Sequence, residues 1–238
     1  MKVSLIGIST PTNANVESPL DVIYTALSQC YNESFTFDDA LNTPEDKKNK
    51  TVKAVLKSGH DSVSEHVSFT FLIENVSRVL THQLVRHRIA SYSHRSARYT
   101  KINSEAEWYV VPKTVKTSEQ IKIFTDIMKE EAVAYNKLIE LGVPKEDARF
   151  VVGDGQCTNI VVTMNCRTLK NFFAERLCTR AQWEIRSLAN KMKDLCVEKL
   201  PVVFKDCAFG EPRCIQNGGF CTEHMCCGKA PKLKDIIK

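Results

Sequence analysis

The sequence predicts a mixed α+β domain with a small irregular tail, and three observations lead to this fold class. Residues 68–74 (SFTFLIE) and 157–165 (CTNIVVTMN) are rich in aromatic and branched side chains, as strands are. Residues 118–141 carry apolar side chains at spacings of three and four, as an amphipathic helix does. Glycine and proline cluster only after Pro201, which predicts a boundary there.

Other segments of the first half predict further elements. Residues 3–8 are a short apolar run typical of a first strand, and residues 20–30 predict a short helix. Thr43 is expected to cap the next helix, with Pro44 in its first position and Gly59 at its end.

The second half is predicted to be mostly helical. Residues 78–86 predict a helix that leads into a polar loop, and residues 145–152 predict a short helix. Residues 168–198 predict one helix, or two helices divided near Thr179. The apolar stripe of residues 118–141 consists of Ile121, Phe124, Met128, Ala132, Tyr135 and Ile139.

Composition limits the class of protein. The 238 residues suffice for one large domain or two small ones, and 43% hydrophobic with 26% charged residues is ordinary for globular proteins. A formal net charge of +5 favours anionic ligands without requiring nucleic acid. No run approaches the ~20 apolar residues that span a bilayer, and residues 3–8 are too short for a signal-peptide core. We therefore expect a cytoplasmic protein without a membrane or nucleic-acid partner, whose cysteines are thiols or metal ligands.

The most unusual segment is residues 86–101, RHRIASYSHRSARYTK. It lies in an interval between Glu74 and Glu105 that contains no acidic residue. The interval holds Arg78, Arg86, Arg88, Arg95, Arg98, Lys101, His82, His87, His94, Ser91, Ser93 and Ser96. Arginine offers a planar set of donors and serine a small hydroxyl, so the pattern is typical of a phosphate site, although a solvated basic face has the same composition.

The spacing of this segment resembles that of a known enzyme family. Arg86-His87-Arg88, followed after seven residues by Ser96 and then by Arg98-Tyr99, resembles the signature of the flavin-dependent thymidylate synthases. Similar elements run in order on both sides. They are Gly59-His60 with Ser62, Glu65-His66, residues 83–86 (QLVR), Val143-Pro144, Ala148-Arg149, residues 165–172 (NCRTLKNF), Arg176 and residues 181–184 (AQWE). The ordered set is far more specific than any single element.

The resemblance implies a fold, a reaction and an assembly. Residues 1–200 are expected to form the catalytic domain, an α+β fold of mixed helices and antiparallel sheet, and residues 201–238 a Cys-rich irregular tail. The implied reaction is the reductive methylation of dUMP to dTMP. Methylenetetrahydrofolate supplies the carbon, and NADPH supplies the electrons through FAD. The implied assembly is a homotetramer whose active sites are shared between subunits.

The resemblance also assigns residues to ligands. FAD is expected to contact Ser62, Arg86, His87, Arg88, His94, Asn165, Arg167 and Asn171. The nucleotide dUMP is expected to contact Gln83, Arg86, His94, Arg95, Ser96, Ala97, Arg98, Arg149 and Arg176. Arg176 is the expected catalytic residue, because a guanidinium beside the uracil ring stabilises the negative charge that develops when C5 acts as a nucleophile.

Three positions depart from the family pattern. The family usually has Asn-Glu where this chain has Ser93-His94, so an imidazole replaces a carboxylate near the nucleotide and the flavin. The family's Leu-Pro pair is replaced around Gly153-Asp154, and Arg180 stands where a histidine is often found.

Other functions fit parts of the sequence. The cysteine-dependent thymidylate synthases use a cysteine that is typically followed by histidine, and no cysteine here is followed by histidine. A homologue of the same fold that alkylates another pyrimidine nucleotide is consistent with His94. A zinc-containing nucleic-acid-binding protein is consistent with the basic segment and the tail.

The tail contains half of the ten cysteines, whereas Cys30, Cys157, Cys166, Cys178 and Cys196 are scattered among apolar neighbours as small core residues are. Cys207, Cys214, Cys221 and Cys226 are the candidate ligands of a structural zinc ion, with Cys227 and His224 nearby. Their spacing contains no Cys-x-x-Cys pair, so free thiols in a loosely ordered tail are the alternative.

Overall fold

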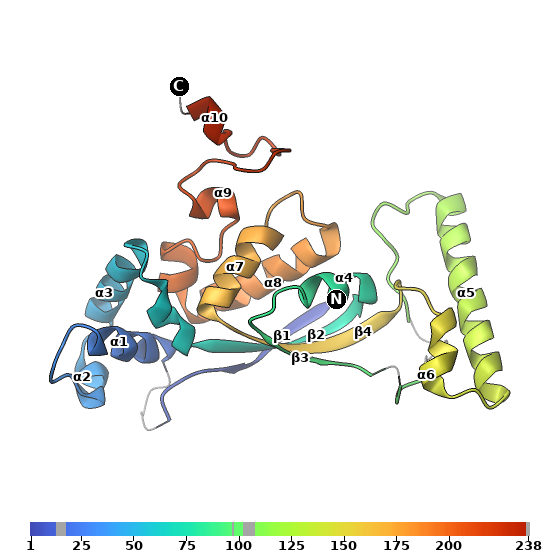
Figure 1. The fold of residues 1–238 in the computed structure, drawn as a ribbon, viewed down its shortest axis with the longest axis horizontal. Helices are drawn as coiled ribbons and strands as arrows, with labels where there is room; N and C mark the ends of the chain where they lie inside the picture. Colours follow the sequence, from blue (N-terminus) through green and yellow to red (C-terminus); the bar gives the residue numbers. More distant parts are fainter. Residues whose placement is uncertain (13–17, 97, 102–107, 237–238) are drawn as a thin grey trace. The chain divides into compact units, whose positions relative to one another are not determined.

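The structure is a computed structural model, and it describes residues 1–12, 18–96, 98–101 and 108–236. Within these residues a four-stranded sheet has the order β1-β2-β4-β3 (Figure 1). The strands are β1 (Lys2–Ile8), β2 (Ser68–Ser77), β3 (Ser91–His94) and β4 (Cys157–Asn165). The α+β fold class is therefore confirmed, and so are the strands expected at residues 3–8, 68–74 and 157–165.

Hydrogen bonds at the strand ends give the strand directions. Ser9 N–H donates to the Ser68 carbonyl at 2.9 Å, so the end of β1 lies beside the start of β2 and the two run antiparallel. The end of β4 lies beside the start of β2 in the same way, because Cys166 N–H donates to the Val67 carbonyl at 2.9 Å. Side chains of β4 alternate between buried and half-buried along the whole strand.

Strand β3 was not predicted, since residues 91–94 were expected to belong to a polar loop. Its side chains carry no apolar alternation, and three of the four are exposed. Pairing with β4 makes it a strand: Arg95 N–H donates to the Asn159 carbonyl at 2.9 Å. Hydrogen bonding to a distant strand, not local propensity, decides the conformation of this segment.

The longer helices agree with the sequence pattern, and the segment at 168–198 is divided into two helices. None of the described helices is long and apolar enough to cross a membrane. The helices are α1 (Pro19–Gln29), α2 (Phe37–Asn42), α3 (Glu45–Lys57), α4 (Arg78–Leu84), α5 (Ser118–Glu140), α6 (Lys145–Ala148), α7 (Cys166–Arg176), α8 (Trp183–Lys199), α9 (Arg213–Gln216) and α10 (Leu233–Ile236). Short 3₁₀ segments lie at Asp61–His66 and Arg149–Val151, and a π-helical turn lies at Val202–Asp206.

The start of α3 corrects one prediction. Thr43 does not cap α3, because its hydroxyl donates to the Asp39 carbonyl at 2.7 Å and Pro44 itself occupies the N-cap position. The helix before it, α2, was not predicted. Thr36 caps α2 and accepts from Asp39 N–H, while the Asp39 carboxylate accepts from Thr36 N–H. This reciprocal pair is a capping box, which satisfies two backbone donors at once.

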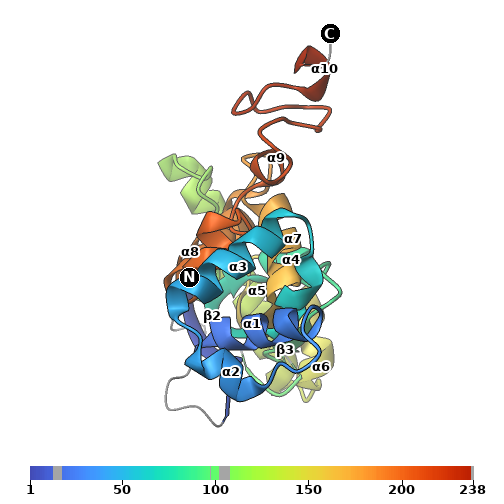
Figure 2. The same ribbon diagram turned by 90° about the vertical axis from the view of Figure 1, so that its left-hand side faces the viewer.

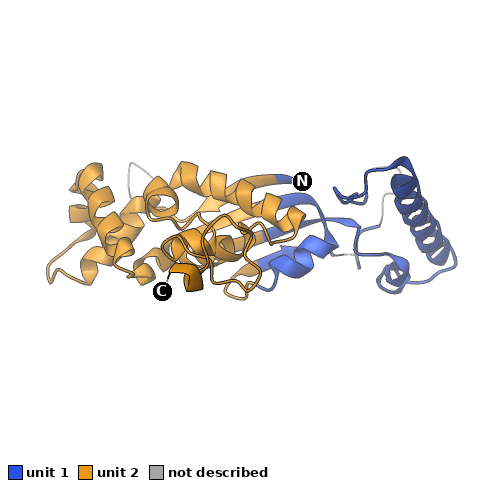
Figure 3. Ribbon diagram, turned by 90° about the horizontal axis from the view of Figure 1, so that it is seen from above, with its two compact units in different colours: residues 1–2, 72–86, 92–161 blue, residues 3–71, 87–91, 162–238 orange. Residues whose placement is uncertain are grey.

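The contacts divide the chain into two units, which are not consecutive segments (Figure 3). Unit 1 comprises residues 1–2, 72–86 and 92–161, and unit 2 comprises residues 3–71, 87–91 and 162–238. Strands β2 and β4 each contribute residues to both units.

The core of unit 2 is built on aromatic rings. Phe204 packs edge to face against Phe69, Phe173 and Phe209, with centroid separations between 5.5 and 6.5 Å. Helices α7 and α8 lie over one face of the strands of this unit (Figure 1). Helices α1, α2 and α3 lie side by side (Figure 2), and a buried ion pair between Lys48 and Asp21, at 2.5 Å, joins α3 to α1.

The core of unit 1 is smaller and contains α5. Met128 and Ala132 of the predicted stripe pack with Trp108, and Phe124 is packed against them. Ile121 departs from the prediction, because its side chain is 41% exposed. Further apolar side chains on or just after α5 are also exposed: Ile123, Ile127, Val133 and Leu141.

Candidate active site

 

Unit 1 contains a cavity whose lining includes three basic side chains and one carboxylate. That cavity, of about 260 Å³, is lined by Arg78 and His82 of α4 and by Arg149, Phe150, Val152, Asp154 and Gln156. Asp154 is the single carboxylate among these lining residues, and its oxygen lies 3.8 Å from His82 Nδ1. Positive charge therefore exceeds negative charge around the cavity, and such a cavity favours an anionic ligand.

Arg78 is the most enclosed of these cations. Its Nε–H donates to Gln156 Oε1 at 3.1 Å, which fixes the guanidinium. Partial burial and the neighbouring Arg149 charge lower the pKa of Arg78, and Asp154 opposes this effect. The sequence placed Arg78 and His82 in the basic interval but assigned neither to a particular ligand, and it did not single out Gln156. The signal available was the spacing of Arg78 and His82, four residues apart on one helix face.

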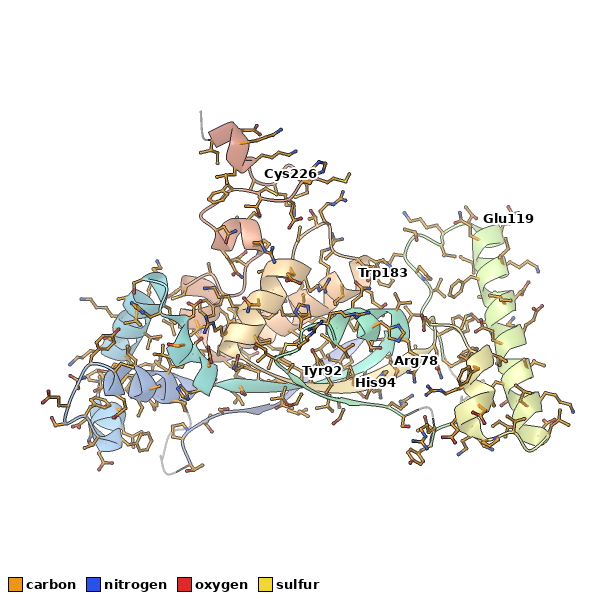
Figure 4. The ribbon with its side chains drawn as sticks, in the orientation of Figure 1. Arg78, Tyr92, His94, Glu119, Trp183 and Cys226 are labelled. Carbon is orange, nitrogen blue, oxygen red and sulfur yellow. The ribbon has the colours of Figure 1, made fainter. Side chains whose placement is uncertain are left out.

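His94, which stands in place of the family's usual glutamate, lies near Arg78 (Figure 4). Its Nε2 is 2.9 Å from the Thr158 hydroxyl. Partial desolvation and the positive charges of Arg78, His82 and Arg95 lower the pKa of His94 to about 4. The imidazole is therefore neutral at physiological pH, whereas a glutamate there would carry negative charge.

The other nucleotide residues predicted in unit 1 lie along α4, β3 and the segment after it. Gln83 is half-buried and donates to the Val79 carbonyl at 3.3 Å, and Arg86 follows α4 and is exposed. The Ser96 hydroxyl accepts from Arg98 N–H at 3.2 Å, and Arg98 Nε–H donates to Glu146 at 2.7 Å. Arg95 and Arg149 are exposed, and Ala97 lies outside the described residues.

Arg176, the predicted catalytic residue, lies in unit 2 at the last position of α7. Its Nε–H donates to His87 Nε2 at 3.0 Å, and the side chain is 21% exposed. His87 packs edge to face against Phe172 with centroids 5.0 Å apart. Burial and the Arg176 charge lower the pKa of His87, so its Nε2 is an unprotonated acceptor. The fold thus holds the guanidinium in one orientation before any ligand binds.

Two predicted flavin residues have structural partners within unit 2. The Asn165 side chain accepts from Thr168 N–H at 2.9 Å and caps α7. Arg167 donates to the carboxylate of Glu65, and both side chains are about half exposed. An exposed ion pair of this kind contributes little to stability, about 0–1 kcal/mol, so Arg167 can exchange its partner for a ligand at small cost.

The remaining predicted flavin residues are exposed donors. Ser62 lies in the 3₁₀ segment before β2, Arg88 follows His87, and Asn171 lies on α7. The two ligand sets therefore separate by unit. Most flavin candidates are in unit 2 and most nucleotide candidates in unit 1; the exceptions are Arg86, His94 and Arg176.

Two of the cysteines outside the tail, Cys166 and Cys196, do not resemble nucleophiles. Burial raises the pKa of the Cys166 and Cys196 thiols well above the ordinary value, which leaves both protonated and unreactive. In the tail, the predicted ligand Cys207 instead lies against the Lys53 carbonyl, at 3.9 Å. Among the residues that the structure describes, no group of three or more His, Cys, Asp or Glu side chains is arranged to hold a metal ion.

An α+β fold that combines a basic cavity with a guanidinium fixed by a neutral histidine defines a protein built to bind anionic ligands. Comparison with known proteins identifies the family. The family described as "Thymidylate synthase complementing protein" matches residues 14–202. The chain belongs to this family.

Individual relatives are similar in sequence to most of the chain. A protein of Clostridium tetani is 39% identical, with 99% of each chain covered. One from Nitratidesulfovibrio vulgaris is 42% identical, covering 92% of this chain and 93% of the relative. One from Pyrococcus horikoshii is 49% identical over 71% of each. All three are named flavin-dependent thymidylate synthase.

Proposed function

We propose that this chain is a flavin-dependent thymidylate synthase, a methyltransferase that converts dUMP to dTMP with methylenetetrahydrofolate as carbon donor and NADPH as electron donor. The observation that carries the proposal is the Arg176–His87 pair. Arg176 is a fixed, partly buried cation, and the family resemblance assigns this residue to the uracil ring, which supports the proposal.

Arg176 has the properties that activation of uracil requires. For C5 to act as a carbon nucleophile, negative charge must develop on the ring nitrogen and oxygens. A guanidinium that is already oriented stabilises this charge without reorganising during the reaction. His87 acts as a positioning residue, since its neutral Nε2 accepts from Arg176 and its ring is held by Phe172.

The basic residues of unit 1 suit the phosphate of the nucleotide. Arg149 lines the cavity that also contains Arg78, and the pKa of Arg78 is lowered partly by the Arg149 charge. A phosphate dianion between two such groups relieves their mutual repulsion while it accepts their hydrogen bonds. His94, neutral in this environment, contributes a hydrogen bond to the nucleotide and not a charge.

The donor set of unit 2 fits FAD. Arg88, Asn171 and Ser62 are exposed N–H and O–H donors, which is the chemistry that a pyrophosphate and an isoalloxazine edge require. Arg167 can turn from Glu65 to the cofactor, and Asn165 keeps an amide N–H₂ available while its oxygen caps α7. When bound, the flavin supplies the hydride that completes the methyl group.

The proposal also includes the assembly of the protein and its location in the cell. The apolar side chains that α5 exposes, together with Phe150 at 83% exposure, favour a homotetramer in which other subunits cover them. The catalytic domain spans residues 1–200, followed by the tail at 201–238, and the enzyme acts in the cytoplasm without a nucleic-acid or membrane partner.

One preparation tests the function. Protein reconstituted with FAD should show flavin absorbance, and should form dTMP from dUMP only when methylenetetrahydrofolate and a reductant are both supplied. A colourless protein that cannot be reconstituted, or a flavoprotein that leaves dUMP unchanged, contradicts the proposal.

A second candidate is alkylation of a different pyrimidine nucleotide, and the environment of His94 favours it. A neutral imidazole among cations recognises different ring substituents from those that a carboxylate recognises. Competition between dUMP and dCMP for the reconstituted enzyme separates the two candidates, since preferred conversion of dCMP supports only the second.

A further inference from the structure

The Cys-rich tail contains a feature that the nucleotide and flavin sites do not use. The Cys221 and Cys226 side chains are hydrogen-bonded to each other, and Cys214 lies close enough to Cys221 to interact with it electrostatically. All three are free thiols. Two thiols in contact are the arrangement from which a disulfide forms with little movement of the backbone.

Backbone N–H groups point at both sulfurs of the pair. Gly228 N–H donates to Cys226 Sγ at 3.4 Å, and Glu223 N–H donates to Cys221 Sγ. The turn at Gly228 has a φ of 82°, which favours glycine. The Glu223 donor lowers the pKa of Cys221, but contact with Cys226, burial and Cys214 outweigh it, so the pKa of Cys221 is raised overall. These backbone donors hold the two sulfurs in place beside each other, and the thiolate is the species that attacks in thiol–disulfide exchange.

The fold of the tail brings the two cysteines together. Cys221 N–H donates to the Pro231 carbonyl at 2.7 Å, and Leu233 N–H donates to the Cys221 carbonyl at 3.2 Å. The chain therefore returns to Cys221 after the intervening loop. Cys226 Sγ is held inside that loop, where it also donates to the Ala230 carbonyl at 3.3 Å. The pair is part of a hydrogen-bonded turn, not a chance approach of two loose side chains.

The tail also lies against the end of α7, within unit 2. Arg180 Nη2 lies 3.5 Å from Met225 Sδ, and Arg213 Nη2 donates to Glu175 at 3.2 Å. These contacts enclose a cavity of about 400 Å³ whose lining includes Arg176 and Cys221. A change in the covalent state of the tail is thus a change in the wall of the cavity that contains Arg176.

We propose that Cys221 and Cys226 form a reversible disulfide by exchange with small-molecule disulfides, and that the oxidised tail restricts the cavity beside Arg176. The thiolate of one cysteine attacks a small disulfide, RSSR, and releases one thiolate RS⁻. The second cysteine thiolate then displaces the other RS⁻ and closes the Cys221–Cys226 bond. The two cysteines are oxidised, RSSR is reduced, and the two protons end on two molecules of RSH.

The first experiment detects the disulfide itself and does not depend on the proposed function. Full-length protein is equilibrated in glutathione buffers with a rising share of the oxidised form, acid-quenched, denatured and alkylated with N-ethylmaleimide. The oxidised protein should carry two labels fewer than the ten cysteines of the chain allow. Fragmentation of the tryptic peptide 214–229 should place the bond between Cys221 and Cys226.

Matched variants test the assignment. Cys221→Ser and Cys226→Ser should each lose the disulfide, whereas Cys227→Ser should keep it, because Cys227 is the exposed neighbour outside the pair. Full labelling in the most oxidising buffer overturns the proposal. So does a bond that maps to Cys214 or Cys227, or bound zinc that protects the thiols from oxidation.

The second experiment tests the link to turnover, which rests on the proposed function. Oxidised protein should retain its flavin but form dTMP more slowly, and dithiothreitol should restore the rate; Cys226→Ser should not respond to oxidation. An equal rate in both states overturns the link to the cavity. Absence of flavin binding and of dTMP formation in both states counts against the proposed function alone, since the labelling result stands without it.

Discussion

The two units use similar polar side chains in different ways. In unit 2, Arg176 is bound to His87, Arg167 to Glu65, and the Asn165 oxygen to the backbone of α7. In unit 1, Arg78 and Arg149 face a common cavity whose lining offers only the Asp154 carboxylate. Unit 2 therefore fixes its groups by internal bonds, whereas unit 1 holds positive charge that an anionic ligand neutralises. Unit 2 thus mainly supplies oriented groups, and unit 1 mainly supplies positive charge.

The largest effect on turnover is expected when the fixed Arg176–His87 pair of unit 2 is broken. Arg176→Ala should reduce dTMP formation by about 10²–10³-fold, the usual loss when a preorganised donor to a developing charge is removed. Flavin binding should be retained. Arg176→Lys should restore turnover only in part, because lysine lacks the planar fork of donors. Single-turnover kinetics of flavin oxidation measures the effect, and near-normal turnover by the alanine variant would remove Arg176 from its role.

Arg88 is an exposed cation of unit 2 that the resemblance assigns to FAD, so it tests whether unit 2 also supplies charge. Arg88→Ala should weaken FAD binding by about 10- to 100-fold, since a hydrogen bond to a charged group contributes roughly 1.5–3 kcal/mol. Fluorescence titration of apoprotein with FAD provides the measurement. Lys113→Ala, a change of the same charge in unit 1, serves as the control; equal weakening by both would indicate a general charge effect.

Arg78 tests the charge of unit 1 directly. Arg78→Gln should weaken dUMP binding by about tenfold or more, because a charge-assisted contact to phosphate is lost. Binding of deoxyuridine, which lacks the phosphate, should change little. Calorimetric titration with both ligands makes the comparison, and an equal loss for both would place Arg78 outside the phosphate contacts.

The pH dependence of folding stability tests whether His94 of unit 1 is surrounded by positive charge. Its pKa of about 4 in the folded protein lies below the ordinary 6.5, so between these values the unfolded chain binds more protons than the folded one. Stability should therefore fall as the pH is lowered from about 6.5 towards 4, and His94→Gln should reduce this dependence. Urea denaturation at several pH values measures it, and an unchanged dependence in the variant would assign the effect elsewhere, for example to His87.

The smallest expected effect concerns Asn165, whose oxygen caps α7. Asn165→Ala should lower stability by about 1 kcal/mol, as loss of an N-cap does, and should also weaken FAD binding. Asn165→Ser keeps the cap but lacks the amide N–H₂ group, so it should recover the stability and not the affinity. Thermal unfolding and FAD titration of both variants distinguish the two roles. Full recovery of affinity by serine would show that Asn165 acts through the helix alone.

Local pattern determined most of the elements of this protein. The alternation of residues 157–165 and the stripe of residues 118–141 each carry their own signal, because side-chain periodicity depends only on neighbours in the chain. The ordered polar motifs also identified the family before any contact was known. In contrast, β3 has no apolar alternation of its own and exists because it pairs with β4.

Only the tertiary structure decided which polar groups meet. Arg176 and His87 are 89 residues apart, and His94 and Thr158 are 64 apart, so no spacing in the sequence connects them. The lowered pKa of His94 depends on burial and then on Arg78, which the sequence places on a different element. The sequence determined the chemical groups that this protein has. Folding decided their charge states and partners, because burial and proximity, which set both, arise only when distant segments pack together.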